Sequence, residues 1–184
     1  MVTSLKIAVV STLLIFGGCS TTDKEDPKSE QKNSDQISKI TPATTPRPQS
    51  VRIEDDNLHA VYQQYLKLSQ ALTDGDVSAA RLASNALEAG ARIVPGGNGL
   101  ATAAANVTMA SSIEKQRSSF SIISNEMVAL VKNSGLRSGQ IYVDYCPMAL
   151  NDKGAYWLSS QEDIKNPYFG DAMLTCGEIK DTIK

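Results

Sequence analysis

The sequence predicts a mainly α-helical protein, in which an antiparallel four-helix bundle is followed by a short strand and an irregular C-terminal segment containing Cys and Met. Three observations lead to this fold class. Apolar residues recur at three- and four-residue spacing between about residues 55 and 134, as in amphipathic helices. The breaks between these stretches are short, which favours antiparallel neighbours. One alternating, β-rich stretch, residues 141–145, then leads into the sulfur-containing segment.

Turn residues delimit the four expected helices. Asp74-Gly75-Asp76 ends the first, and the Asp76 side chain is suited to cap the second. The Pro-Gly-Gly-Asn-Gly run at residues 95–99 ends the second helix. A third, Ala-rich helix is expected over about residues 100–110, and a fourth from residue 113 to a stop at Gly135. The apolar stripe of the first helix consists of Leu58, Val61, Tyr62, Tyr65, Leu68 and Leu72.

The N-terminus has the pattern of a bacterial lipoprotein signal peptide, residues 1–18. Lys6 supplies the positive charge, and the apolar run Ile7 to Phe16 is too short to span a bilayer as a helix. Phe16-Gly17-Gly18-Cys19 resembles a lipobox, which implies lipidation of Cys19 after cleavage before it. The alternative is an ordinary secretory signal that leaves Cys19 as a free thiol. Either signal predicts an extracytoplasmic protein, and lipidation predicts attachment to a bacterial membrane.

Residues 19–52 are expected to form a disordered tether, and residues 53–184 the folded domain. The tether is rich in Ser, Thr, Pro and charged residues and has few large apolar side chains to bury. The formal net charge of the chain is −2. Because no basic patch is visible, nucleic acid is not expected as a partner.

The sequence offers no pattern for catalysis. His59 is the only histidine, so neither a Ser-His-Asp triad nor a His-rich metal site can be assembled. His59 lies beside the apolar stripe of the first helix, where a polar residue at the edge of the bundle is the ordinary interpretation. A role as an additional metal ligand is the alternative. We therefore do not expect an enzyme.

The candidate site lies in the C-terminal quarter, where two sulfur pairs occur. In Cys146-Pro147-Met148, residues two apart in an extended chain point to the same side. In Met173-Leu174-Thr175-Cys176, residues three apart share a face if the segment is helical. Thiolate and thioether ligands together favour a soft ion such as Cu(I).

Three structural interpretations compete with a metal site. Cys146 and Cys176 can form a disulfide, the default for two cysteines in an oxidising compartment. That bond would close a loop of about thirty residues and stabilise the fold by roughly 3–4 kcal/mol. Both can instead be buried thiols, and Met148 and Met173 can be ordinary core residues. Residue types alone leave the disulfide slightly favoured over the metal site.

Four phrases of this segment, YCPMA, KGAYWLS, IKNPYFG and MLTCGE, together resemble an extracytoplasmic bacterial family of unassigned biochemical function. Members of that family occur as lipoproteins and as domains fused to adaptor subunits of copper/silver heavy-metal efflux pumps. The resemblance runs from about Leu58 to the C-terminus and is densest over residues 142–178. It implies a helical domain with a role near copper handling.

By position, the resemblance places the family's Cys and Met residues at Cys146, Met148, Met173 and Cys176. Relatives often have histidines around residues 117–120, and this chain has Arg-Ser-Ser-Phe there. A site in this protein is therefore expected to be sulfur-only or supplemented by His59. The expected function is binding of Cu(I), for sequestration or hand-over to an efflux adaptor. The alternative is a structural or protein-interaction domain with a Cys146–Cys176 disulfide and no metal.

Overall fold

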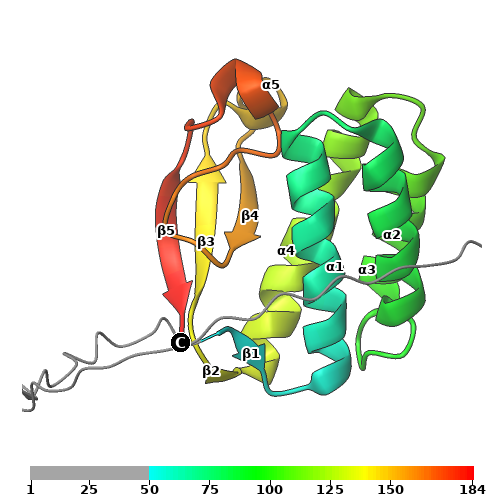
Figure 1. Cartoon of the computed structure of the whole chain (residues 1–184), viewed down its shortest axis with the longest axis vertical. Coiled ribbons are helices and arrows are strands. Elements are labelled where there is room, and N and C mark those ends of the chain that lie inside the picture. Colours follow the sequence, from blue (N-terminus) through cyan, green and yellow to red (C-terminus); the bar gives the residue numbers. More distant parts are fainter. Residues whose placement is uncertain (1–49) are drawn as a thin grey trace, which may run out of the picture. The chain divides into compact units, whose positions relative to one another are not determined.

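The computed structural model describes residues 50–184, so the expected signal peptide, Cys19 and nearly all of the expected tether lie outside the described residues. Four helices form the bundle (Figure 1). They are α1 (Asp56–Thr73), α2 (Val77–Ala91), α3 (Asn98–Met109) and α4 (Ile113–Ser134). Asp76 caps α2 as predicted, since its carboxylate accepts hydrogen bonds from the Ser78 and Ala79 amides at 2.9 Å. The predicted fold class is confirmed.

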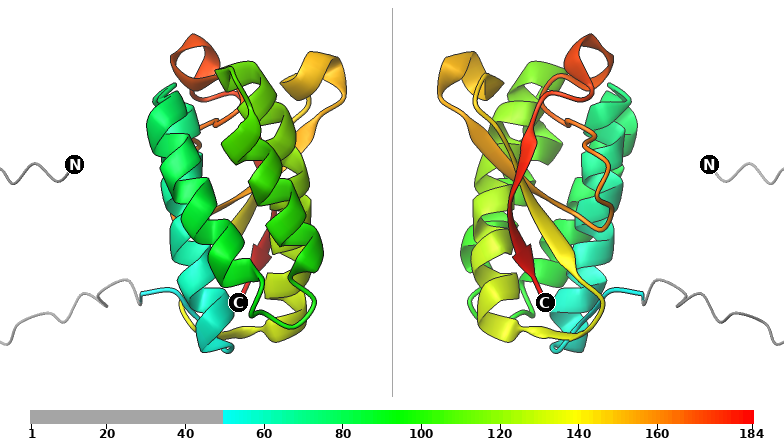
Figure 2. Two further views of the ribbon diagram at one scale, coloured as in Figure 1. Left: turned by 90° about the vertical axis from the view of Figure 1, so that its right-hand side faces the viewer. Right: turned by 90° about the vertical axis from the view of Figure 1, so that its left-hand side faces the viewer.

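The C-terminal segment contains more β-structure than the sequence predicted. The predicted strand becomes β3 (Ile141–Cys146), and β4 (Ala155–Ser159) and β5 (Glu178–Ile183) flank it in an antiparallel sheet of order β4-β3-β5. Short elements connect these strands, namely α5 (Ala149–Asp152) and the 3-10 helix η1 (Gly170–Met173). Figure 2 shows the sheet on the face of the domain opposite α2 and α3.

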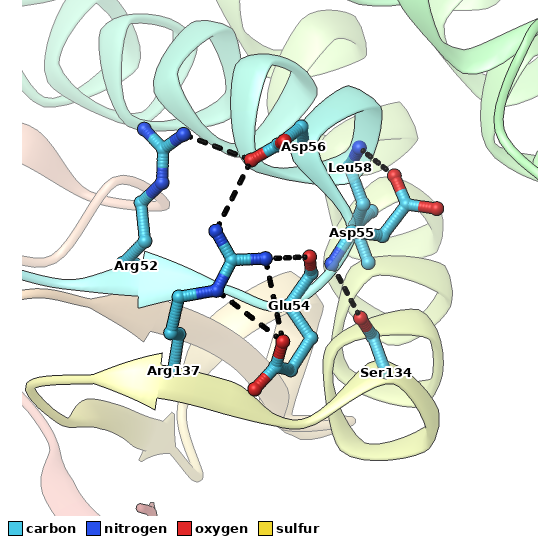
Figure 3. A network of polar contacts seen from close by, with 7 residues as sticks. All are labelled: Arg52, Glu54, Asp55, Asp56, Leu58, Ser134 and Arg137. Atoms are coloured by element: carbon cyan, nitrogen blue, oxygen red, sulfur yellow. Dashed lines mark hydrogen bonds and ion pairs between the residues drawn. The ribbon is translucent and has the colours of Figure 1, made fainter.

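A second, two-stranded ladder closes one end of the bundle. In it, β1 (Arg52–Ile53) pairs with β2 (Leu136–Ser138), which follows α4 directly. Arg137 donates to the Glu54 carbonyl at 2.8 Å and pairs with the Glu54 carboxylate, and Arg52 pairs with Asp56 at 2.8 Å (Figure 3). These side chains are exposed, so each ion pair contributes about 0–1 kcal/mol. The ladder's main effect is to fix where the chain enters α1.

Tyr65 joins the helical layer to the sheet. Its ring is fully buried and stacks on Phe120 of α4, with ring centroids 5.2 Å apart. Its hydroxyl accepts a hydrogen bond from the Leu158 amide of β4 at 2.9 Å and shares another with Ser124 of α4 at 2.9 Å. An edge-strand amide is thus satisfied by a side chain of the bundle, which makes packing of the sheet depend on α1.

Removing this hydroxyl should destabilise the protein. Tyr65→Phe leaves the buried Leu158 amide without a partner, which costs about 1–3 kcal/mol. Urea denaturation at neutral pH measures the change. The neighbouring Tyr62 provides a matched control, because its buried hydroxyl has no hydrogen-bond partner in the described structure. Tyr62→Phe should therefore be neutral or stabilising, and equal losses in the two variants would contradict this role for Tyr65.

Candidate functional site

Cys146 is the last residue of the central strand β3 and is fully buried. It pairs across the ladder with Ala155 of β4. On the other side of β3, Tyr145 pairs with Glu178 of β5. Since the strands run antiparallel, the residues just before β5 lie beside the end of β3, and a Cβ on Gly177 would be 3.2 Å from the Tyr145 carbonyl oxygen. The register of β5 therefore brings the residue beside Gly177, which is Cys176, to the end of β3.

Asn166 holds the backbone around Cys176 in place. Its side-chain amide donates to the Cys176 carbonyl at 2.7 Å, and its own backbone amide donates to the Leu174 carbonyl at 2.8 Å. The Cys176 amide in turn donates to the Met173 carbonyl at 3.1 Å. Asn166 is fully buried, and its side-chain oxygen accepts from the Tyr168 amide at 2.8 Å. Asn166 thus positions the backbone on both sides of Cys176, a role that sequence reasoning missed.

The thiols of Cys146 and Cys176 are free and interact with one another. Hydrogen bonding with the Cys146 thiol, followed by burial, raises the pKa of Cys176 to about 11. Cys146 is fully buried, whereas Cys176 is half-buried. Two residues thirty positions apart in the sequence thus present sulfur to the same place. Because this raised pKa keeps the Cys176 thiol protonated at neutral pH, metal binding or disulfide formation at Cys176 must release a proton.

The two methionines of the predicted site lie close to these cysteines in the chain but are less enclosed. Pro147 and Met148 form a turn directly before α5, so the Cys-Pro-Met segment is not extended as the sequence predicted, and Met148 is 48% exposed whereas Cys146 is buried. Met173 is the last residue of η1 and is half-buried. The Cys176 amide donates to the Met173 carbonyl, so these two residues lie about one turn apart. Met148 thus follows Cys146 by two residues, and Met173 precedes Cys176 by three.

His59 is not brought to the thiol pair. It lies in the first turn of α1, and burial and the nearby Arg52 guanidinium lower its pKa. Cys146 instead ends β3, and Figure 1 shows the start of α1 and the end of β3 at opposite ends of the domain. Within residues 50–184, no group of three or more His, Cys, Asp or Glu side chains is arranged to hold a metal ion.

Arg117 of α4 links the loop before η1, which leads to Cys176, to the helical bundle. Its guanidinium donates to the Pro167 carbonyl at 3.0 Å and to the Leu72 carbonyl, in the last turn of α1, at 2.9 Å. Gly170, with φ +58°, lies so close to α1 that a Cβ there would be 2.5 Å from the Thr73 carbonyl oxygen. The family resemblance singled out residues 117–120 as a stretch where relatives often have histidines and this chain has none. In the structure its arginine is a brace between α4, α1 and the loop before η1.

The connection between β3 and β4 contains a strained left-handed turn. Leu150, Asn151 and Asp152 have φ of 55°, 60° and 61°, so α5 is not a right-handed α-helical turn. Each non-glycine residue in this conformation costs roughly 1–2 kcal/mol. The left-handed residues begin two positions after Met148, at the edge of the candidate site.

Asp144 is a functional candidate that the sequence alone did not single out. It lies two residues before Cys146 on β3, and its side chain is fully buried. Neither carboxylate oxygen has a hydrogen-bond partner in the described structure. Burial raises the pKa of Asp144 to about 7. The signal that could have found it was an acidic residue inside a strand whose other residues are apolar or aromatic.

Comparison with known proteins identifies one domain. A family model described as "Protein of unknown function (DUF3347)" matches residues 61–139, from the second turn of α1 through the end of β2. The match includes most of the bundle and ends before β3, so both cysteines lie outside it. No curated protein and no solved structure matches the chain. No helix within residues 50–184 has the length and hydrophobicity needed to span a membrane. The region from residue 61 to 139 is therefore similar to a domain family whose function is not assigned.

Proposed function

We propose that this protein is a membrane-anchored, extracytoplasmic lipoprotein that binds a soft metal ion, Cu(I), through Cys146 and Cys176 with help from Met148 and Met173. Its task would be to sequester the ion or pass it to a heavy-metal efflux adaptor. The observation that carries the proposal is the meeting of two free thiols from distant parts of the chain. Thiolate and thioether sulfur favour Cu(I) over harder ions, which prefer oxygen or imidazole ligands.

The surroundings of the thiol pair also favour a sulfur-only site. The one histidine lies elsewhere in the described structure, and no third His, Cys, Asp or Glu side chain joins the pair in a ligand cluster. Met148 is exposed and Met173 half-buried, so neither thioether is enclosed in the hydrophobic core. The sequence resemblance to domains fused to copper/silver efflux adaptors supports copper as the bound ion. Lipidation at Cys19 and the extracytoplasmic location belong to the proposal as well.

Anaerobic titration with Cu(I) in competition with a chromophoric chelator tests the proposal. The full chain should be used in detergent with Cys19→Ser, which removes the third thiol. Cys176→Ser should weaken binding by roughly three orders of magnitude, or about 4 kcal/mol, because one of two thiolates is lost. Met148→Ala and Met173→Ala should each cost about tenfold, or about 1.4 kcal/mol.

Met109→Ala is the control for the loss of a thioether, because Met109 is 73% exposed at the end of α3. It should leave the affinity unchanged. Equal affinity in all three methionine variants would remove the thioethers from the site.

A second candidate function follows from the same two thiols. If the two thiols form a permanent disulfide, the chain is a structural or protein-interaction domain cross-linked between Cys146 and Cys176. The proximity of the thiols favours this candidate as much as it favours a metal, because an extracytoplasmic compartment is oxidising. A fully reduced chain that binds no Cu(I) would support this candidate over the first.

A further inference from the structure

We propose that Cys146 and Cys176 form a reversible disulfide that switches the metal site off, so that the protein holds Cu(I) only when the pair is reduced. This inference rests on the proposed function, because it concerns regulation of the same site. The Cu(I)-binding thiols and the disulfide, which were alternatives above, then become the reduced and oxidised states of one protein. Its physical basis is the position of the two sulfurs and their unequal exposure.

The register of the sheet brings the two cysteines to the same end of β3. Tyr145 of β3 pairs with Glu178 of β5, so Cys146 follows the last pair on one strand and Cys176 lies two residues before it on the other. A Cβ on Gly177 would be 3.2 Å from the Tyr145 carbonyl oxygen, so the chain just before β5 lies directly against the end of β3. The two thiols interact at this junction. A disulfide would join these two side chains.

The unequal exposure of the two thiols determines which one reacts first with an oxidant. Cys146 is fully buried, whereas Cys176 is half-buried and accessible to a small oxidant. With a disulfide such as oxidised glutathione, the Cys176 thiolate attacks one sulfur, forms a mixed disulfide and releases one glutathione thiolate. The Cys146 thiolate then attacks the Cys176 sulfur and releases the second. The cysteine pair loses two electrons, which reduce the oxidant, and the two thiol protons leave on two molecules of reduced glutathione.

The backbone around Cys176 is held by contacts that do not involve its thiol. The Cys176 carbonyl is held by Asn166 and its amide by Met173, and neither hydrogen bond involves the thiol. Reduction should therefore return the Cys176 sulfur to the same place. A disulfide offers no thiolate to a metal, so oxidation removes both anionic ligands and leaves only the thioethers. Metal affinity should fall accordingly.

The test uses the full chain with Cys19→Ser, equilibrated without oxygen against mixtures of reduced and oxidised glutathione. Mass spectrometry after alkylation should show the Cys146–Cys176 disulfide forming and disappearing with the ratio. After removal of glutathione, the oxidised chain should bind Cu(I) at least a thousandfold more weakly than the reduced chain. Affinity should return after reduction. A pair that stays reduced in excess oxidised glutathione would overturn the inference, as would equal Cu(I) affinity in both states.

The order of reaction gives an independent readout. Cys146→Ser should accumulate the glutathione adduct on Cys176, whereas Cys176→Ser should stay largely unmodified. In the chain retaining both cysteines, brief exposure to iodoacetamide should label Cys176 before Cys146, which checks accessibility without a substitution at either thiol. Faster labelling of Cys146 would overturn the proposed order. If the reduced chain binds no Cu(I), the proposed function fails, and the switch fails with it. If both states bind equally, only the switch fails.

Discussion

Replacing Asp144 with asparagine should make the protein more stable at pH 8 and remove a loss of stability that the wild type shows between about pH 4 and 7. The Asp144 carboxyl is fully buried without a hydrogen-bond partner in the described structure, and burial raises its pKa from 3.8 to about 7. A difference of about three pKa units corresponds to a free energy on the order of 4 kcal/mol. Asparagine should recover about half of it, because an unpaired amide is still costly to bury.

The direction of the pH dependence follows from proton binding. Below about pH 4 the carboxyl is protonated in both the folded and the unfolded chain, so it imposes no penalty. Between about pH 4 and 7 the unfolded chain ionises while the folded chain keeps its proton, and the free energy of unfolding falls as pH rises. Above about pH 7 both states are ionised and the loss is complete. His59, whose pKa is lowered, contributes the opposite slope just below its ordinary pKa of 6.5.

Urea denaturation at half-unit steps from pH 4 to 8 measures this profile. The comparison should include His59→Asn, to remove the opposing slope, and Asp163→Asn as a control at an exposed position of the loop after β4. Asp163→Asn should follow the wild-type profile. An Asp144→Asn variant with the wild-type slope would show that this carboxyl does not dominate the pH dependence.

Gly177→Ala should destabilise the fold and disturb the thiol pair together. Gly177 has φ +147°, which L side chains rarely adopt, and a Cβ there would be 2.7 Å from the Trp157 ring and 3.2 Å from the Tyr145 carbonyl oxygen. Backbone strain and overpacking each cost about 1–3 kcal/mol, so we expect a loss of about 3 kcal/mol or more. The neighbouring Cys176 should then be displaced from Cys146, which weakens Cu(I) binding.

Gly75→Ala separates strain from crowding. Gly75 has φ +71° in the turn after α1, and a Cβ added there would meet no atom within 4 Å, so alanine at this position introduces strain alone. The stability of this variant should fall by only about 1 kcal/mol, with unchanged Cu(I) affinity. Denaturation and titration of both variants give the comparison. Equal losses at the two glycines would mean that close packing at Gly177 does not position Cys176.

The helical half of the fold could be predicted because its signals are local. Three- and four-residue spacing marks α1, Asp76 caps α2, and Gly135 ends α4 with φ +80°. Each depends on residues within one or two turns of each other. The strand at residues 141–145 was also visible, because alternation and β-branched or aromatic residues act over a few positions.

The sheet and the site depend on contacts between distant residues. The segment that forms β5, EIKDTI, is too polar to predict as a strand from its own pattern, and it forms by pairing with β3. The loop after residues 160–164 is likewise held by distant contacts, since Asn166 donates to the Cys176 carbonyl and Arg117 of α4 donates to the Pro167 carbonyl. The meeting of the two cysteines was predicted from a family resemblance and from residue types. The burial of Asp144 could not be predicted from the sequence, because it depends on how the sheet packs in the fold.

X-ray absorption at the copper edge identifies the atoms bound to the ion without assuming which residues supply them. We expect the reduced chain with Cys19→Ser, loaded with one equivalent of Cu(I), to show a first shell of sulfur only. Cys176→Ser should lose sulfur from that shell, and Met109→Ala should not. A shell of nitrogen or oxygen, or a spectrum unchanged by Cys176→Ser, would contradict a copper site at the junction of β3 and β5.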